Sequence, residues 1–117
     1  MIRYSREYLE ALLGRVDIVE VIRSFLPMRR TRGGDYVTLC PFHVEKRPSF
    51  KVMSSKQFYY CHACGASGHA IKFLMEHQEL TYPDAIRWLA NRYRFYQAEW
   101  LRKCRQRARR IQHKPNE

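Results

Sequence analysis

Four residues in the first two thirds of the chain have side chains and spacings that suit one metal ion. Cys40 and His43 form a C-x2-H pair, and Cys61 and Cys64 form a C-x2-C pair seventeen residues later. Each pair fits on a tight turn, so both of its ligand atoms can reach a zinc ion at about 2.0–2.3 Å. Four protein ligands leave no open coordination position for water, so the pattern predicts one structural Zn²⁺ ion and no catalytic one.

Cysteine pairs also occur in rubredoxin-like iron sites and in disulfides. One of the four candidate ligands is a histidine, and no secretory signal or long apolar run precedes the motif, so both alternatives are less favourable than zinc. We therefore expect a reduced, cytoplasmic setting and no membrane partner.

The chain is short for an independently stable fold. Its 117 residues fit one small domain with an appendage, and small domains bury too little apolar surface to be strongly stable unaided. A structural zinc site contributes on the order of 10–16 kcal/mol of apparent binding free energy in small peptides. Removing the metal is therefore expected to unfold at least the motif region.

Positive charge is concentrated near the C-terminus. The formal net charge is +11, and residues 87–117 hold ten of the 22 Lys and Arg residues but two of the 11 Asp and Glu residues. Such a distribution predicts a polyanionic partner, with nucleic acid ahead of an anionic membrane surface or an acidic protein.

Hydrophobic periodicity and turn residues divide the chain into short elements. Helices are expected over residues 4–13 and from an N-cap at Asp17 to Phe25. Two hairpins should follow, the first over 28–32 and 36–39 and the second over 49–53 and 57–60. The first hairpin ends directly before Cys40 and the second directly before Cys61, so the strands would deliver these two residues to the metal.

Helices should complete the domain. Ile71, Phe73, Leu74 and Met75 suggest a helix that covers the sheet, and Thr81 to Asp84 resembles a capping box that starts another helix reaching Tyr93. The predicted class is α+β, a zinc-ribbon-like small antiparallel sheet with flanking helices. We place the domain at residues 1–94 and a basic, helical tail at 95–117.

Longer motifs in the same region carry a family resemblance. The sequence contains C-P-F-H-x-E-K-x-P-S-F, then K-Q-F-x-x-C-x-x-C-G-x-x-G, then I-x-F-L-M. Over roughly residues 15–92 it resembles the N-terminal zinc-binding domain of bacterial DnaG-type DNA primase. The resemblance carries the metal ligands onto Cys40, His43, Cys61 and Cys64. The other coinciding motif residues are Glu45, Lys46, Pro48, Ser49, Phe50, Lys56, Gly65 and Gly68.

The resemblance implies a role in DNA replication. In that family the zinc ribbon holds single-stranded template and helps to select where a primer starts, while a separate domain makes the RNA. The implied partners are single-stranded DNA and a primase catalytic core, a replicative helicase, or both. His62 and Ala63 stand where the family usually has an aromatic residue and glycine, so template preference can differ here.

The chemistry of the expected sheet agrees with that role, because cations alternate with aromatic residues along it. Cations can follow phosphates, and aromatic faces can stack bases at about 1–3 kcal/mol each. Since strand side chains alternate between faces, Phe50 and Phe58 are expected in the core instead. Arg29, Arg30 and Arg32 either extend the basic face or keep a strand edge charged. The predicted nucleic-acid contacts are Lys46, Arg47, Lys51, Lys56, Tyr59, Tyr60 and His62.

Residues for primer synthesis itself are missing from the pattern. A polymerising site needs clustered carboxylates to hold divalent metal ions, whereas Asp17, Asp35 and Asp84 are far apart in the sequence. We therefore predict no catalytic residue and a catalytic core supplied elsewhere, with this chain either a stand-alone protein or a fragment of a longer primase. The alternative is a regulatory or accessory replication protein that uses the zinc fold as a scaffold and the basic tail for binding.

Overall fold

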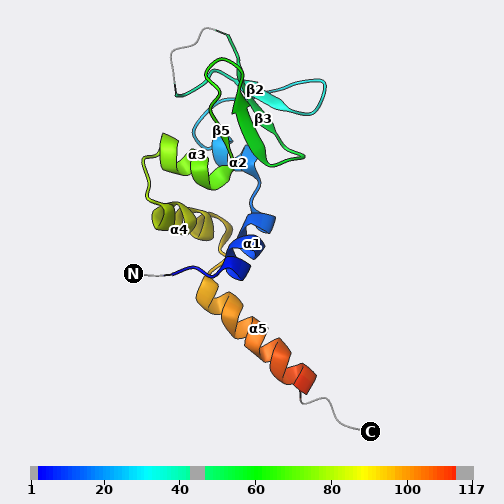
Figure 1. Cartoon of the computed structure of the whole chain (residues 1–117). Helices are drawn as coiled ribbons and strands as arrows, with labels where there is room; N and C mark the ends of the chain where they lie inside the picture. The colour runs from blue at the N-terminus through cyan, green and yellow to red at the C-terminus, as the bar shows by residue number, and fades with distance from the viewer. Residues whose placement is uncertain (1–2, 43–46, 113–117) are drawn as a thin grey trace.

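The computed structural model describes residues 3–42 and 47–112 and has the predicted α+β architecture. A small sheet lies at one end of an elongated molecule, helices pack beneath it, and the last helix projects from the opposite end (Figure 1). The helices are α1 (Arg6–Arg15), α2 (Ile18–Arg23), α3 (Ala70–His77), α4 (Tyr82–Tyr93) and α5 (Gln97–Gln112). None of these helices is long and apolar enough to cross a membrane.

The sheet is a five-stranded antiparallel meander, in which spatial order follows sequence order. Its strands are β1 (Arg29–Arg30), β2 (Tyr36–Thr38), β3 (Phe50–Met53), β4 (Phe58–Cys61) and β5 (Ser67–Gly68). The two predicted hairpins are confirmed and pair with each other through β2 and β3. Strand β5 was not expected, because its two residues are too short to show an alternating pattern.

One face of the sheet forms part of the core. Phe50 and Val52 of β3 and Tyr59 of β4 have no exposed surface, and α2 and α3 cover them. The Tyr59 ring stacks on Phe50 with centroids 5.2 Å apart and meets Phe73 of α3 edge-on at 5.9 Å. The prediction that Phe50 is buried is confirmed. Phe58 is only half-buried because it is one residue from Tyr59 and therefore lies on the other face.

Side-chain caps define where the helices begin. The Asp17 carboxylate accepts a hydrogen bond from Val19 N at 3.0 Å, and the Thr81 hydroxyl accepts one from Asp84 N at 3.3 Å. These bonds satisfy amide groups that have no partner within a first helical turn. Both predicted N-caps are confirmed.

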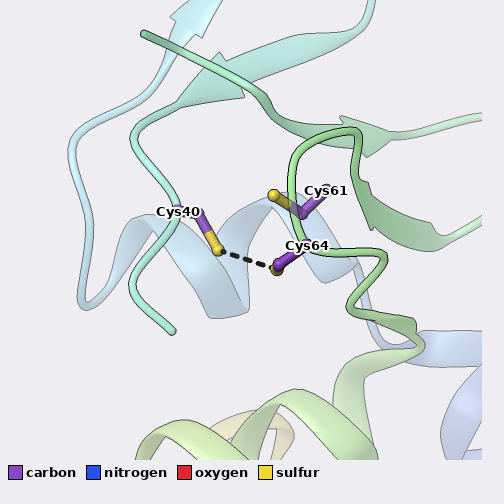
Figure 2. A group of neighbouring side chains, drawn as sticks. All are labelled: Cys40, Cys61 and Cys64. Carbon is purple, nitrogen blue, oxygen red and sulfur yellow. Dashed lines mark hydrogen bonds between the residues drawn. The ribbon is translucent and has the colours of Figure 1, made fainter. Parts of the chain in front are cut away.

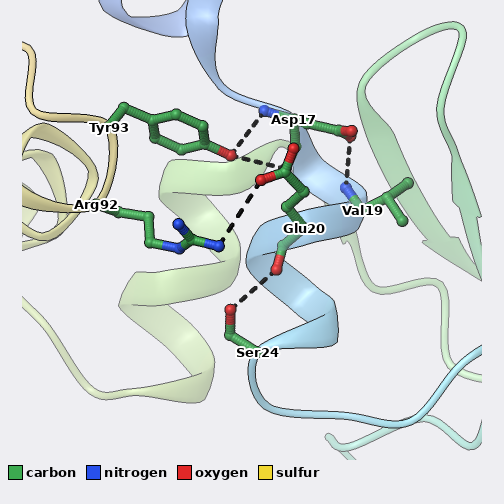
Figure 3. Close-up of polar contacts among 6 residues, drawn as sticks. All are labelled: Asp17, Val19, Glu20, Ser24, Arg92 and Tyr93. Atoms are coloured by element: carbon green, nitrogen blue, oxygen red, sulfur yellow. Dashed lines mark hydrogen bonds and ion pairs between the residues drawn. The ribbon is translucent and has the colours of Figure 1, made fainter.

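Helices α2 and α4 are joined at the Asp17 cap (Figure 3). The Tyr93 hydroxyl accepts a hydrogen bond from Asp17 N at 3.1 Å and lies 3.4 Å from Asp17 O, to which it donates. Arg92 and Glu20 form an ion pair at 3.7 Å, but both side chains are about half exposed, so little stability is expected from it. The partly buried Tyr93 hydroxyl is therefore expected to stabilise this junction more than the ion pair does.

The first turn of α5 packs on the N-terminal segment. The Gln97 side chain accepts a hydrogen bond from Ser5 N at 2.7 Å and donates one to Arg3 O at 2.9 Å. Trp100 packs against Tyr8 of α1, with ring centroids 6.0 Å apart. Beyond this turn the side chains of residues 102–108 are exposed. The tail is helical, as predicted, and the contacts of Gln97 and Trp100 fix the orientation of the first turn of α5.

Candidate metal centre and sheet surface

Three thiols meet where the ends of two strands approach each other (Figure 2). Cys40 follows β2 by two residues, Cys61 is the last residue of β4, and Cys64 lies on the turn after it. Their sulfur atoms all lie within 4.8 Å of one another, and Cys40 Sγ is 3.8 Å from Cys64 Sγ. The structure therefore brings together the three predicted cysteine ligands. His43 lies outside the described residues.

Backbone hydrogen bonds shape the turn that carries Cys61 and Cys64. Gly65 N donates to Cys61 O at 2.8 Å, and Cys61 N donates to Ala66 O at 2.8 Å. Gly65 has φ of +77°, a conformation that glycine adopts without the steric penalty of a Cβ atom. The second of these bonds holds Ala66, the residue before β5, against the end of β4 and closes the loop beside the metal site.

The donor set fits zinc. Zn–S bonds of about 2.3 Å in a tetrahedron require sulfur atoms about 3.8 Å apart, and the Cys40–Cys64 separation has that value. Cys40 and Cys61 are buried, while Cys64 is exposed. Of the four cysteines, Cys104 alone is far away in sequence and absent from the cluster, so the described structure groups only the thiols of the two motifs.

The surroundings of the thiols favour one thiolate when metal is absent. Burial raises the pKa of Cys40 to about 12. Burial also opposes ionisation of Cys61, but hydrogen bonds from the Ser49 hydroxyl, 3.5 Å away, and from N–H groups of the turn outweigh it. Together they lower the pKa of Cys61 to about 6. Zinc binds cysteines as thiolates, so these hydrogen bonds favour the form of Cys61 that a metal ligand requires.

The outer face of the sheet presents a row of cross-strand neighbours. The β-ladder aligns residues from all five strands, and their side chains share the face opposite the core. Lys51 pairs with Tyr60 directly across β3 and β4, and its ammonium group lies 3.4 Å from the Asp35 carboxylate. The row consists of Arg29, Val37, Lys51, Tyr60 and Ser67.

An aromatic pair stands beside this row, next to the metal turn. Tyr60 is 37% exposed, and the exposed His62 ring meets it edge-on with centroids 5.0 Å apart. His62 is also joined to β3, because its N–H donates to Ser49 O at 3.0 Å. The structure therefore gathers three predicted contact residues, Lys51, Tyr60 and His62, on one surface.

The remaining predicted contacts have other positions. Arg47 is exposed on the loop before β3, and Lys56 is exposed at the tip of the β3–β4 hairpin, at the end of β4 away from Cys61. Lys46 lies outside the described residues. The predicted nucleic-acid contact at Tyr59 is wrong for this structure, because Tyr59 has no exposed surface. Side chains alternate between the faces of a strand, so Tyr59 points into the core while Phe58 and Tyr60 lie on the other face.

Two exposed residues of this surface were not among the contacts predicted from the sequence. Arg29 joins the outer row only through the register of β1 with β2, and Leu39, 50% exposed, lies just before Cys40. The signal for Arg29 was the Gly33–Gly34 turn, which fixes which residues of the hairpin face each other. A two-residue turn of Gly33 and Gly34 would have paired Arg29 with Thr38, whereas the observed turn is centred on Gly33, with Thr31 N donating to Asp35 O, and pairs Arg29 with Val37.

Comparison with known protein families identifies the family of this chain. The family model of the CHC2 zinc finger, the DnaG zinc ribbon, matches residues 4–103. The chain belongs to the CHC2 zinc-finger family. The resemblance found in the sequence is thereby confirmed, and the family together with the three-thiol cluster identifies zinc as its metal.

Relatives of this CHC2 zinc finger are bacterial proteins named DNA primase. The chain is 48% identical over 86 residues to the protein of Neisseria meningitidis serogroup A, which covers 74% of this chain and 14% of the relative. It is 48% identical over 87 residues to that of Pseudomonas aeruginosa, covering 74% and 13%. The chain thus spans about one seventh of the length of the relatives it matches.

A solved structure shares the fold of this CHC2 zinc finger. It is the crystal structure of the Aquifex aeolicus primase, described as its zinc-binding and RNA polymerase domains. The TM-score is 0.70 at 41% sequence identity, over 74% of this chain and 21% of the other. The family model and the solved structure therefore agree on the fold class and on the primase family.

Proposed function

We propose that this chain is the template-binding zinc module of a bacterial-type primase and holds single-stranded DNA during synthesis of an RNA primer. The observation that carries the proposal is the outer row of the sheet, where Lys51, Tyr60 and His62 lie together beside the cysteine cluster. This surface combines a cation with exposed aromatic rings on a rigid support, which is the usual composition of a single-strand site.

Each group on this surface has a separate role in the proposal. Lys51, half-exposed and already beside Asp35, attracts a phosphate and is held in direction by that carboxylate. Tyr60 offers a ring face to a base, and the edge-on contact with His62 keeps that ring from rotating freely. A stacked base is worth about 1–3 kcal/mol. Arg29, at the far edge of the row, would meet the next phosphate.

The metal has a structural role in this proposal. We assign Cys40, His43, Cys61 and Cys64 as its four ligands. When bound, zinc ties the end of β2 to the end of β4 and so fixes the strands that carry Lys51 and Tyr60. The protein residues keep this end of the sheet in register, because Ser49 and Cys61 already bond across it.

The catalytic core is proposed to be elsewhere. Among the described residues, the cysteines form the one group of three or more His, Cys, Asp or Glu side chains that could hold a metal ion. Primer synthesis requires metal-binding carboxylates, so a separate domain or chain must supply them. The relatives are named DNA primase, and the Aquifex structure contains an RNA polymerase domain. We therefore propose such a core as the partner, with a replicative helicase as a further one.

The test measures, by fluorescence anisotropy, the binding of zinc-loaded full-length protein to short single-stranded DNAs of varied sequence. Tyr60→Ala should weaken the preferred DNA about tenfold, as expected for one lost stack of about 1–2 kcal/mol. Tyr82→Ala is the matched control, because Tyr82 is 46% exposed but lies on α4. Lys51→Gln should weaken binding, while Lys72→Gln, on the covered side of the sheet, should not.

The result also separates the proposal from its alternative. If the DNAs bind with a base preference that Tyr60→Ala removes, the sheet reads the template. If all DNAs bind equally and Tyr60→Ala changes nothing, the zinc fold is a scaffold and the chain is a regulatory or accessory replication protein that binds through its basic tail. The full chain is needed because α5 packs on α1 through Gln97 and Trp100.

A further inference from the structure

A second basic surface lies at the end of the molecule opposite the sheet. The end of α1, the turn between α4 and α5, and the first turns of α5 enclose an open hollow of about 250 Å³. Figure 1 shows the base of α5 at the far side of the helical layer from the strands. Its charged and aromatic lining includes Arg15, Arg94, Glu99, Trp100, Lys103 and Arg107.

Positive charge exceeds negative charge in the lining of this hollow. Arg15, Arg94, Lys103 and Arg107 supply four cations, and Glu99 supplies the one carboxylate of the lining. None of these four cations forms an ion pair with a residue in the described part of the chain, whereas Arg92 nearby is paired with Glu20. With four cations and one carboxylate, like charges still repel one another, so a bound anion would relieve an existing cost.

The walls of the hollow are fixed by buried contacts. The Tyr8 hydroxyl donates to Phe95 O at 2.5 Å, and the Tyr8 and Phe95 rings stack at 5.5 Å. The Arg15 guanidinium lies 4.3 Å from the centre of the Phe95 ring, in a cation–π contact that holds it over the turn. Because Trp100 also packs on Tyr8, the first turn of α5 cannot swing away without breaking these contacts.

Two cations of the hollow lie on α5. Lys103 and Arg107 are four residues apart, so they stand on the same face of the helix about one turn from each other. Arg102 and Arg105 are also exposed but lie on other faces of the helix. Lys103 and Arg107 therefore present two cations about one helical turn apart on the α5 wall of the hollow, which suits a ligand with neighbouring negative charges.

We propose that this hollow and the adjoining face of α5 bind the phosphate backbone of a nucleic acid, as a site separate from the sheet surface. A nucleic acid fits better than an acidic peptide for two reasons. Neighbouring phosphates of one strand can meet Lys103 and Arg107 together, and the exposed Tyr96 ring at the rim offers a stacking surface for a base. Contacts of this kind position a strand without reading its sequence.

The test compares two double variants with the same loss of charge. Lys103→Gln with Arg107→Gln removes the two cations of α5 that line the hollow, and Arg102→Gln with Arg105→Gln removes two cations of α5 that do not line it. Binding of full-length zinc-loaded protein to a 20-residue oligo-dT and to a 20-base-pair duplex is measured across a salt series. Unfolding midpoints of both variants verify that each is folded.

We expect the first double variant to bind oligo-dT about tenfold more weakly and to lose about 1.4 from the slope of log K against log salt. The second should lose less than threefold. The indole N–H signal of Trp100, assigned with Trp100→Phe, should shift on addition of oligo-dT in the native chain. An equal loss on the duplex would extend the site to duplex backbones, and a loss on oligo-dT alone would restrict it to single strands.

Two results would overturn the inference. One is an equal loss in both double variants, which would make the effect a diffuse property of a basic helix. The other is competition by polyglutamate as strong as that by oligo-dT, which would indicate a protein partner. Repeating the comparison in a Tyr60→Ala background separates the two sites, since failure of the sheet proposal would leave the effect of Lys103→Gln with Arg107→Gln intact.

Discussion

The hydroxyl of Tyr8 donates a hydrogen bond to the backbone carbonyl of Phe95, 87 residues later in the chain. Tyr8 has no exposed surface, and its burial, together with nearby tyrosines, raises its pKa to about 12, so the hydroxyl remains a donor over the neutral range. The bond joins the first helix to the turn from which α5 departs. It therefore links the direction of the basic helix to the core of the domain.

Tyr8→Phe should destabilise the domain by about 1–2 kcal/mol, because the ring stack remains but the Phe95 carbonyl loses its partner. Urea unfolding of the zinc-loaded protein measures the change in free energy. Tyr96→Phe is the control, since Tyr96 is 42% exposed and should change stability by less than about 0.5 kcal/mol. Equal effects of the two variants would mean that the bond to Phe95 is not formed in solution.

The α2–α4 junction should respond to its hydroxyl and not to its charges. Tyr93→Phe leaves Asp17 N without its partner and removes the longer of two bonds to Asp17 O, which keeps the bond from Val21 N, so it should cost about 1–2 kcal/mol. Arg92→Gln, which removes the exposed ion pair with Glu20, should cost less than about 0.5 kcal/mol. Thermal unfolding at fixed zinc concentration distinguishes them, and the reverse ranking would contradict the structure.

Tyr59 offers a test of which face of the sheet binds DNA. Its buried hydroxyl has no hydrogen-bond partner among the described residues, and burial raises its pKa. Tyr59→Phe removes this unsatisfied group and keeps the ring, so stability should stay equal or rise by up to about 1 kcal/mol. DNA affinity should not change. A loss of affinity comparable to that of Tyr60→Ala would restore Tyr59 as a contact.

Tyr59 also shows how far sequence reasoning reached. Motif spacing is local, so it identified the cysteines that the structure brings within 4.8 Å of each other. Helix caps are local too, and Asp17 and Thr81 were found for that reason. The face on which a strand side chain lies depends on the exact register of the strand. The sequence predicted Phe58 in the core, whereas the buried residue is its neighbour Tyr59, so this prediction was wrong by one residue.

Long-range polar contacts could not be predicted. The Gln57 side chain accepts a hydrogen bond from Ile18 N at 2.7 Å and donates to Ser54 O at 2.8 Å, which fastens the second hairpin to the start of α2. The sequence placed Gln57 at the beginning of a strand and gave it no other role. Such a bond joins residues 39 positions apart and leaves no periodic trace. The packing of α5 on α1 through Gln97 was hidden for the same reason.

Metal removal should destabilise the sheet end of the molecule more than the helical end. Chelation, or Cys64→Ser, takes away the tie between β2 and β4, and structural zinc of this kind is worth about 10–16 kcal/mol in small peptides. The amide protons of Val37 and Lys51 should then exchange rapidly with solvent. Those of Leu89 and Trp100 should remain slower, because the contacts of Tyr8 with Phe95 and Trp100 do not include a metal ligand.

Cys104→Ser is the matched control for the metal experiment, since Cys104 is an exposed thiol on α5 outside the cluster. It should keep one zinc per chain by elemental analysis, while Cys64→Ser should fall well below one. Hydrogen exchange followed by NMR reports both ends in a single experiment. If Leu89 and Trp100 exchange as fast as Val37 after chelation, the helical layer depends on the metal as well, and the two proposed nucleic-acid sites would be lost together.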